Sequence, residues 1–325
     1  MRLQLYIIHI LLSFLIAVSA TSCIESNKSE PQQLVRLDQI INNNTQPTLV
    51  EMQTIERYAQ IMGLYNDSTT HIEYDELCDI IENTYWYNFF SNDTDSILKN
   101  LNSIDNDLER LNHNISYHFP NLPKYNYYGI ISPYRQRIII DSCNIYVALN
   151  HYLGEDYPGY ASMPEYERQL KHCNRIPIEI TEAILSSEYP YIKKTDSTTL
   201  NELIYEGAVA YTLILLLPDM DIYKYLGWNI DQIKYVESNS SDIWQQIVSK
   251  NLLYSNDSSI SRQLNDIAES SSIISSSTPP RIGRYIGYCI ANDYINANPG
   301  MTCQQILSPD FYNDNSVLIK ASPKF

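Results

Sequence analysis

The residue whose type and position most suggest chemistry is Glu206, a carboxylate at the start of an apolar segment. Residues 199–221 read TLNELIYEGAVAYTLILLLPDMD, and no charged residue lies between Gly207 and Leu217. A carboxylate that enters a protein core needs a cationic partner or a chemical role. Two interpretations stay open: Glu206 forms an ion pair with an arginine or a helix N-terminus, or it is a metal ligand or an acid–base residue.

Two arginines near the C-terminus could supply the partner for this carboxylate. Arg281 and Arg284 bracket Gly283, and Gly287 follows one helical turn later. Glycines at this spacing let another backbone approach closely. We therefore expect a buried arginine of this segment, with Arg284 as the candidate, to pair with Glu206.

A histidine is the next candidate for chemistry. His151 comes just before residues 154–160, a loop whose glycines and proline predict an irregular shape. His151 could act as a ligand or an acid–base residue, or it could bond to the last carbonyls of a helix as a cap. His172 and Cys173 are adjacent, and adjacent residues on a helix point apart, which argues against a catalytic dyad.

Standard catalytic motifs are absent from the sequence. There is no HExxH for a zinc peptidase and no P-loop, and there is no GxSxG nucleophile elbow. None of the six cysteines forms a CxxC pair, which excludes zinc ribbons and thioredoxin-type redox sites. If Cys23 is modified, five cysteines remain, so at least one free thiol is expected.

The composition predicts a mostly α-helical (α+β) protein that can fill a core. The chain has 325 residues, of which 44% are hydrophobic and 18% charged. It has only nine glycines, which argues against a glycine-rich nucleotide-binding α/β protein. The formal net charge of −16 argues against nucleic acid as a partner, because phosphate contact needs clustered Lys and Arg.

The elements that must position these residues are mainly helices. Apolar spacing and helix-stop signals predict them over residues 34–41, 49–64, 74–90, 95–119, 142–153, 178–187, 199–217, 230–253, 281–297 and 302–307. Thr199 and Glu202 predict a capping box at the start of the helix that carries Glu206. This helix is apolar on nearly every face, so it must be buried, and it is too short to span a bilayer.

One segment has a strand-like pattern. Residues 127–131 and 137–141 are short β-rich runs on either side of a turn-like link, 132–135, and predict a β-hairpin. Residues 270–277 are rich in serine and predict a linker or a flexible loop. No internal repeat or domain boundary is visible, so we interpret residues 34–325 as a single helical domain.

The N-terminus carries a targeting segment, residues 1–22, with Arg2 before a long apolar run. Two cleavage sites are possible. Small residues up to Ala20 suit an ordinary signal peptidase, which would leave Thr21 first. Alternatively, Ala20-Thr21-Ser22-Cys23 resembles a bacterial lipobox, and residues 23–33 would then be a lipidated tether. We favour the lipobox, with Cys23 as the lipid anchor, since acyl chains anchor a protein to a membrane without a spanning helix.

Eight segments resemble one known family in combination. They are LVRLDQI (34–40), PNLPKYNYYGIIS (120–132), HYLGEDYPGY (151–160), MPEY (163–166), LNELIYEG (200–207), LLPDMD (216–221), IWQQIVSKNLLYSND (243–257) and PPRIGRYIGYCIANDYI (279–295). Together they resemble the gliding-motility lipoprotein GldB family over essentially the whole mature chain. The resemblance implies a lipoprotein of the cell envelope of Gram-negative bacteria, which agrees with the interpretation of Cys23.

That family is in turn similar to zinc-dependent peptidases of the zincin type, which implies a zincin-like core. In those relatives HExxH lies on one helix and the third zinc ligand is the glutamate of an EG pair on the next. Glu206-Gly207 matches the EG pair, and the HExxH position falls near Glu179 and Glu182, but both histidines are missing. The resemblance therefore implies the scaffold without a His₂Glu zinc site, with no metal and no cofactor.

These arguments lead to one expected function and two alternatives. We expect an envelope-anchored lipoprotein with a structural or binding role in gliding motility or linked envelope machinery. It would be held to the inner or outer membrane by its lipid and would contact envelope proteins. The first alternative is a metal-dependent hydrolase with unusual ligands around Glu179, Glu206 and His151. The second is a glycan-binding lipoprotein, suggested by the 28 tyrosines, with Tyr157 as a stacking residue.

Overall fold

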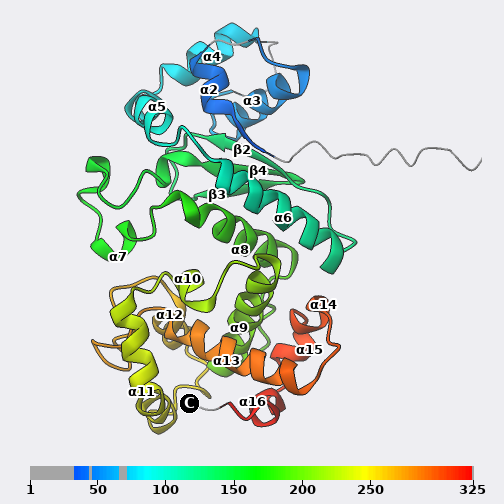
Figure 1. The fold of residues 1–325 in the computed structure, drawn as a ribbon, viewed down its shortest axis with the longest axis vertical. Helices are drawn as coiled ribbons and strands as arrows, with labels where there is room; N and C mark the ends of the chain where they lie inside the picture. The colour runs from blue at the N-terminus through cyan, green and yellow to red at the C-terminus, as the bar shows by residue number, and fades with distance from the viewer. Residues whose placement is uncertain (1–32, 44–45, 66–71, 324–325) are drawn as a thin grey trace, which may run out of the picture. The chain divides into compact units, whose positions relative to one another are not determined.

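The computed structural model of the protein describes residues 33–43, 46–65 and 72–323 (Figure 1). The expected signal segment and the tether up to residue 32, including Cys23, lie outside the described residues. The described part is mostly α-helical with one four-stranded sheet. The prediction of a mostly α (α+β) fold is confirmed.

The N-terminal half contains the sheet and the helices on both of its sides. Its elements are β1 (Leu34–Arg36), α2 (Leu37–Asn42), α3 (Leu49–Ile61), α4 (Tyr74–Glu82), α5 (Tyr85–Ile97), α6 (Asn102–His118), β2 (Asn126–Ile130), β3 (Ile138–Asp141), β4 (Asn144–Ala148), η1 (Leu149–His151), η2 (Pro158–Tyr160) and α7 (Glu165–Arg168). In the view of Figure 1, α2 to α5 lie above the sheet, and α6 and α8 lie below it.

The C-terminal half is helical. Its elements are η3 (Cys173–Arg175), α8 (Ile176–Glu188), α9 (Thr199–Leu216), α10 (Ile222–Leu226), α11 (Ile230–Ser249), α12 (Ser258–Asn265), α13 (Ile282–Ala297), α14 (Cys303–Ile306), α15 (Pro309–Tyr312) and α16 (Ser316–Ala321). The helices predicted over residues 178–187, 199–217, 230–253 and 281–297 are confirmed as α8, α9, α11 and α13. The short helices α10 and α12 were not predicted.

The sheet corrects the predicted hairpin. The strand order is β1-β2-β4-β3, with β2 parallel to both β1 and β4 and with β3 antiparallel to β4. The hairpin is therefore β3–β4, and residues 142–153, predicted as a helix, form β4 and η1 instead. The error has a physical cause: β4 is a central strand buried along Ile145–Ala148, and a short continuous apolar run does not distinguish a buried strand from a helix.

The two faces of the sheet belong to two hydrophobic clusters. Tyr128 and Tyr146 face the cluster that contains α2 to α5, whereas Tyr127, Ile145 and Val147 face the larger cluster with α6, α8, α9 and α13. This follows from the alternation of side chains along each strand. The sheet thus fixes α8 at a defined position, with β3 at its side.

Several predicted boundaries in the N-terminal half are wrong. Residues 34–41 begin as strand β1 rather than as a helix, residues 74–90 are two helices, and residues 95–97 belong to α5 rather than to α6. The break between α4 and α5 has a local cause, since Thr84 accepts a bond from the N–H of Tyr87 and caps α5. Tyr85 and Phe89 on α5 are exposed rather than buried with Tyr87.

Helix α9 is buried, as its sequence predicts, and it packs closely against α13. Its capping box is formed by Thr198 and Asn201, not by the predicted Thr199 and Glu202. Gly207 and Gly287 face each other at the crossing. A Cβ on Gly207 would lie 1.9 Å from the carbonyl carbon of Gly287, so the two backbones touch here because neither residue has a side chain.

The serine-rich segment 270–277 is a packed loop. The backbone N–H of Ser271 donates to the carbonyl of Thr278, and Ser271 and Ile274 are buried. The segment is thus a loop, as one of the two expectations had it, and its contacts with the core contradict the alternative of a linker between domains.

Candidate functional site

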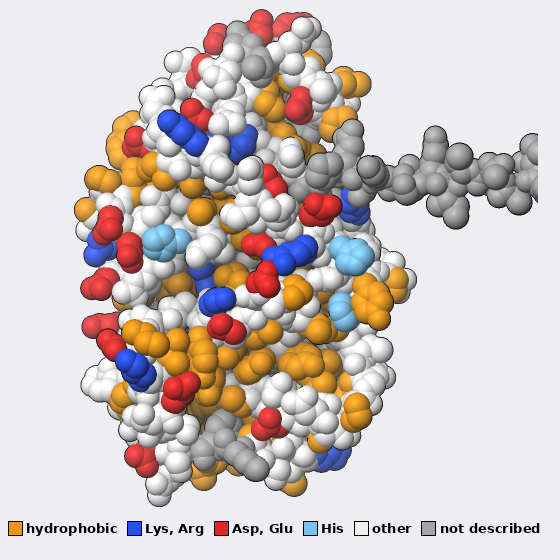
Figure 2. All heavy atoms as spheres, in the orientation of Figure 1, with side chains coloured by type: hydrophobic (Ala, Val, Ile, Leu, Met, Phe, Trp, Pro, Cys, Tyr) orange, Lys and Arg blue, Asp and Glu red, His pale blue; other side chains and the backbone are white. Residues whose placement is uncertain are grey.

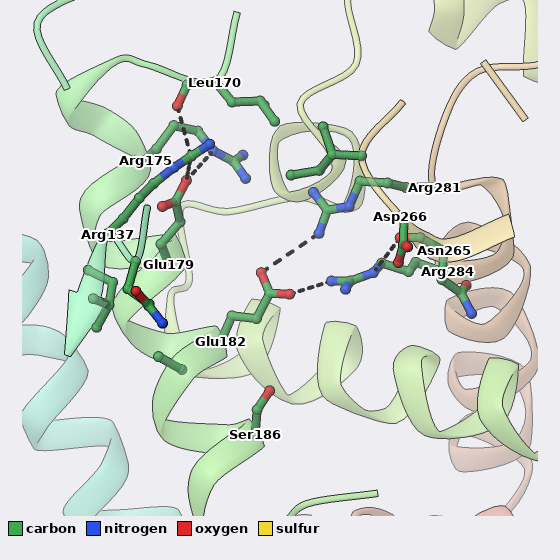
Figure 3. A pocket seen from close by; sticks show the side chains of 14 residues that line it. Arg137, Leu170, Arg175, Glu179, Glu182, Ser186, Asn265, Asp266, Arg281 and Arg284 are labelled. Atoms are coloured by element: carbon green, nitrogen blue, oxygen red, sulfur yellow. Dashed lines mark hydrogen bonds and ion pairs between the residues drawn. The ribbon is translucent and has the colours of Figure 1, made fainter. Parts of the chain in front are cut away.

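A polar cavity of about 470 Å³ lies between α8, the start of β3, and the N-terminal end of α13 (Figure 3). Its lining contains four arginines, namely Arg137, Arg175, Arg281 and Arg284. It also contains Glu179, Glu182 and Asp266, together with Leu170, Ser186 and Asn265. In Figure 3, Arg137 and Arg175 lie on one side with Glu179, Arg281 and Arg284 lie on the other side, and Glu182 lies between them.

Helix α8 places two glutamates towards the cavity. Glu179 and Glu182 are three residues apart, which puts them on one face of the helix. One oxygen of Glu179 accepts a hydrogen bond from Nη1 of Arg137 at 2.6 Å, and the other accepts from the hydroxyl of Tyr152 at 2.7 Å. Nε of Arg175 is 3.9 Å from the first of these oxygens. Glu179 is thus held by one arginine and one tyrosine, with a second arginine nearby.

Glu182 lies between the two arginines of the α13 end. Arg284 donates to one of its oxygens, and Nη2 of Arg281 is 3.7 Å from the other. Burial alone would raise the pKa of Glu182, but the attraction of Arg284 and Arg281 outweighs burial and lowers the pKa to about 2. Glu182 is therefore a carboxylate at every pH at which the protein is expected to work.

Glu206 on α9 shares the same arginine. Its Oε2 lies 3.2 Å from Nε of Arg284. The ion-pair interpretation of Glu206 agrees with this contact, and the expected pairing with Arg284 is present. Burial raises the pKa of Glu206, the pull of Arg284 opposes that rise, and the negative charge of Glu182 adds to it. One guanidinium thus serves two carboxylates, and Glu182 holds it more firmly than Glu206 does.

Arg281 and Arg175 fix the end of α10. Nη1 of Arg281 donates to the carbonyl of Tyr225 at 3.1 Å, and Nη1 of Arg175 donates to the carbonyls of Lys224 and Tyr225 at 2.6 and 3.1 Å. Cations bonded to the last carbonyls of a helix satisfy groups that the helix itself leaves unpaired. Arg281 adopts a left-handed conformation, with φ of 62°, just before α13, and its guanidinium lies over the ring of Tyr225.

Sequence reasoning missed Arg137 and Arg175. Arg137 comes from the start of an edge strand, and Arg175 from the short η3 turn before α8, so neither shares a helix face with the predicted residues. One signal was available in part: Arg175 and Glu179 are four residues apart across the start of a predicted helix. The position of Arg137 depends on the sheet order, which the sequence pattern did not reveal.

His151 does not line the cavity. Its Nε2 is 2.9 Å from the carbonyl of Tyr134, and its Nδ1 is 3.1 Å from Nζ of Lys171. An ammonium can only donate, so Nδ1 must accept and Nε2–H must donate, which makes the ring neutral. Burial and the nearby charge of Lys171 lower the pKa of His151 to about 4. The helix-cap interpretation of His151 is wrong, because the carbonyl that it contacts belongs to the loop before β3.

The donor set of the cavity does not fit a catalytic zinc ion. Among the residues that the structure describes, no group of three or more His, Cys, Asp or Glu side chains could hold a metal ion. A His₂Glu site needs imidazole ligands. Glu179, Glu182 and Glu206 instead direct oxygens to arginines, and a cation would have to displace those guanidinium groups.

Tyr157, the residue named for glycan stacking, is buried. Its hydroxyl donates to Asp93 at 2.7 Å, and its ring packs against Tyr160 and Phe90. A stacking residue must present an open aromatic face to the sugar, and Tyr157 does not. The tyrosine content is largely explained by the core, where many tyrosines are fully buried.

Comparison with known proteins identifies a family. A family model described as gliding motility protein GldB matches residues 23–321. No curated protein and no solved structure matches the chain. In the part of the chain that the structure covers, no helix is both long enough and apolar enough to cross a membrane.

Proposed function

The chain belongs to the gliding motility protein GldB family, and from this premise we propose that it is an envelope-anchored lipoprotein with a structural or binding role in gliding motility or linked envelope machinery. Its anchor is Cys23, with acyl chains that hold the protein on the inner or outer membrane. Its partners are the membrane, through this anchor, and proteins of the envelope. We do not propose nucleic acid as a partner, because the formal net charge of the chain is −16 and phosphate contact needs clustered Lys and Arg. On the face drawn in Figure 2 the basic side chains are scattered.

One observation favours a binding role over catalysis: all three carboxylates at the positions expected for a peptidase site are paired with arginines. Glu179, Glu182 and Glu206 are all engaged by guanidinium groups. A general base must be free to take a proton, and a metal ligand must be free to bind a cation. The protein is accordingly a pseudo-peptidase, a zincin-like scaffold that works without a catalytic metal or another cofactor.

The alternative of a metal-dependent hydrolase requires Glu179, Glu206 and His151 to meet around one ion. His151 is bound to Tyr134 and Lys171 and does not line the cavity. The two glutamates lie on different helices, and each directs an oxygen to a different arginine. This arrangement favours the binding role.

The edge of the sheet offers a surface for a protein partner. Among the strands of residues 33–323 that the structure describes, β3 pairs with β4 alone and is the last strand of the sheet, so its other side is an edge. Arg137 and Ile138, where β3 begins, line the cavity. An extended peptide that added to β3 as a further strand would gain main-chain hydrogen bonds along the strand and side-chain contacts in the cavity.

Replacement of the chromosomal gene tests the role. A strain that produces Glu179→Gln and a strain that produces Glu206→Gln should keep the gliding or envelope phenotype that deletion of the gene removes, provided that the variants accumulate normally. A strain that produces Cys23→Ala, a variant without the anchor, should lose the phenotype. The protein would instead be an enzyme if both glutamine variants, at normal protein levels, lost the phenotype and also lost a hydrolytic activity.

A further inference from the structure

The charges in the cavity are not balanced. Four arginines, Arg137, Arg175, Arg281 and Arg284, line the cavity together with Glu179 and Glu182, and Glu206 pairs with Arg284 from α9. Asp266 also lies on the lining, but it is exposed at the rim, where solvent screens its charge. The buried part of the cavity therefore has one positive charge in excess, in a chain whose formal net charge is −16.

Two buried donors beside this cavity have no hydrogen-bond partner among the described residues. They are Nε of Arg175 and Nε of Arg281, and the two side chains are only 8% and 4% exposed. Buried donors are normally satisfied, because an unpaired one loses its hydration without compensation. Nη2 of Arg281 lies 3.7 Å from Glu182, which is beyond hydrogen-bond distance.

The arginines are also held in place before any ligand arrives. Backbone carbonyls of α10 fix Arg175 and Arg281, and Glu179 fixes Arg137. Burial lowers the pKa of Arg175, the attraction of Glu179 opposes this, and the like charge of Arg281 adds to it. An anion that reached both arginines would be attracted by both charges. A volume of about 470 Å³ is that of a small-molecule site.

We propose that this cavity binds the anionic group of a small ligand, a carboxylate or a phosphate, through Arg137, Arg175 and Arg281. The guanidinium fork matches both groups, since each presents two oxygens to parallel N–H donors. The inference deepens the proposed binding function by naming the ligand class of the same cavity, and it rests on that function. An anionic side chain of a peptide on β3 and a free anion are two sources of the same chemistry.

The test is calorimetric titration of the full-length protein in detergent with inorganic phosphate and, separately, with succinate at matched ionic strength. We expect saturable binding of at least one probe. Arg137→Gln should weaken it about tenfold or more by removing a charged donor. Arg57→Gln is the matched control, because Arg57 pairs with Asp141 outside the cavity, and it should leave binding unchanged.

A second variant separates a binding site from a purely structural network. Glu179→Gln removes a cavity charge that competes for Arg137 and lies near Arg175, so the variant should bind the anion more tightly even if it is less stable. Preference for phosphate or for succinate identifies the group, and a peptide with one glutamate that competes with succinate identifies a peptide source.

Three results would overturn the inference: no saturable binding of either probe, equal weakening by Arg137→Gln and Arg57→Gln, or unchanged affinity in Glu179→Gln. None of these results contradicts the proposed function. That proposal is contradicted by a different result, namely that the protein binds a stoichiometric metal ion and hydrolyses peptides.

Discussion

Oε2 of Glu206 on α9 lies 3.2 Å from Nε of Arg284 on α13, and the same guanidinium donates to Glu182 on α8. One arginine of α13 therefore joins the consecutive helices α8 and α9 to a helix that follows much later in the sequence. The arrangement explains how the carboxylate of Glu206 can lie within the buried helix α9, because its charge is met by a buried cation.

The first prediction concerns the Glu206–Arg284 pair. Arg284→Glu should destabilise the protein by about 3–5 kcal/mol, since it leaves two glutamates without their arginine. Adding Glu206→Arg should recover only part of this loss, because Glu182 has lost the hydrogen bond from Arg284 and keeps only Arg281, 3.7 Å away. Chemical denaturation of both single variants and the double variant measures the coupling energy, which we expect to be about 1 kcal/mol or more. Strictly additive effects would show that the two side chains do not interact.

The second prediction concerns Glu182 and its pH dependence. The folded-state pKa of Glu182, about 2, lies below its ordinary value of 4.5, so its stabilisation is present above pH 4.5 and is lost as the pH falls towards 2. Glu182→Gln should therefore cost about 3 kcal/mol at pH 7, and the difference from the unmodified protein should shrink in acid. Denaturation curves across this pH range measure the difference in unfolding free energy. A difference that does not change with pH would contradict the ion pair.

Glu206→Gln is the matched comparison for Glu182→Gln, and its pH dependence should have the opposite sign. The pKa of Glu206 is raised by burial, so its contribution favours the folded state at acid pH and is lost as the pH rises through the folded-state pKa. At pH 7 this variant should cost clearly less than Glu182→Gln, in the same denaturation experiment. An equal cost would mean that Arg284 holds both carboxylates alike.

The third prediction concerns the contact of α9 and α13. Gly207→Ala should destabilise the protein by about 3 kcal/mol or more, because its Cβ would lie 1.9 and 2.0 Å from the carbonyl carbon and oxygen of Gly287. Gly63→Ala is the control: no heavy atom lies within 4 Å of its Cβ, and only its positive φ opposes the change, at about 1 kcal/mol. Thermal unfolding of the two variants measures their losses of stability. Equal losses would contradict the close packing of α9 against α13.

The fourth prediction concerns the protonation of His151. With its pKa lowered to about 4 by burial and by Lys171, the ring should stay neutral down to about pH 5. Histidine-selective NMR measures its titration, and His151→Gln identifies the resonance. The unfolded chain takes up this proton near pH 6.5 while the folded protein does not, so His151 makes stability fall as the pH drops from 6.5 towards 4. A midpoint near 6.5 would contradict the bonds to Tyr134 and Lys171.

The sequence predicted the central helices and half of the site. The long apolar helix α9, the helix with the two glycines, and the pairing of Glu206 with an arginine follow from patterns within single segments. The sheet order, and with it Arg137, did not follow, because the buried strand β4 lacks the alternation that marks a half-exposed strand. The position of His151 was also missed, since it depends on Lys171 and Tyr134 from two other loops.

Glu179, Glu182 and Glu206 form ion pairs with arginines, and we propose that they serve binding rather than metal chemistry. The direct test is metal analysis of the full-length protein, purified in detergent and dialysed against zinc and then against buffer. We expect no stoichiometric zinc in the unmodified protein or in Glu206→Gln. One zinc ion per chain that is lost in Glu206→Gln would contradict the binding role and indicate a metal-dependent hydrolase.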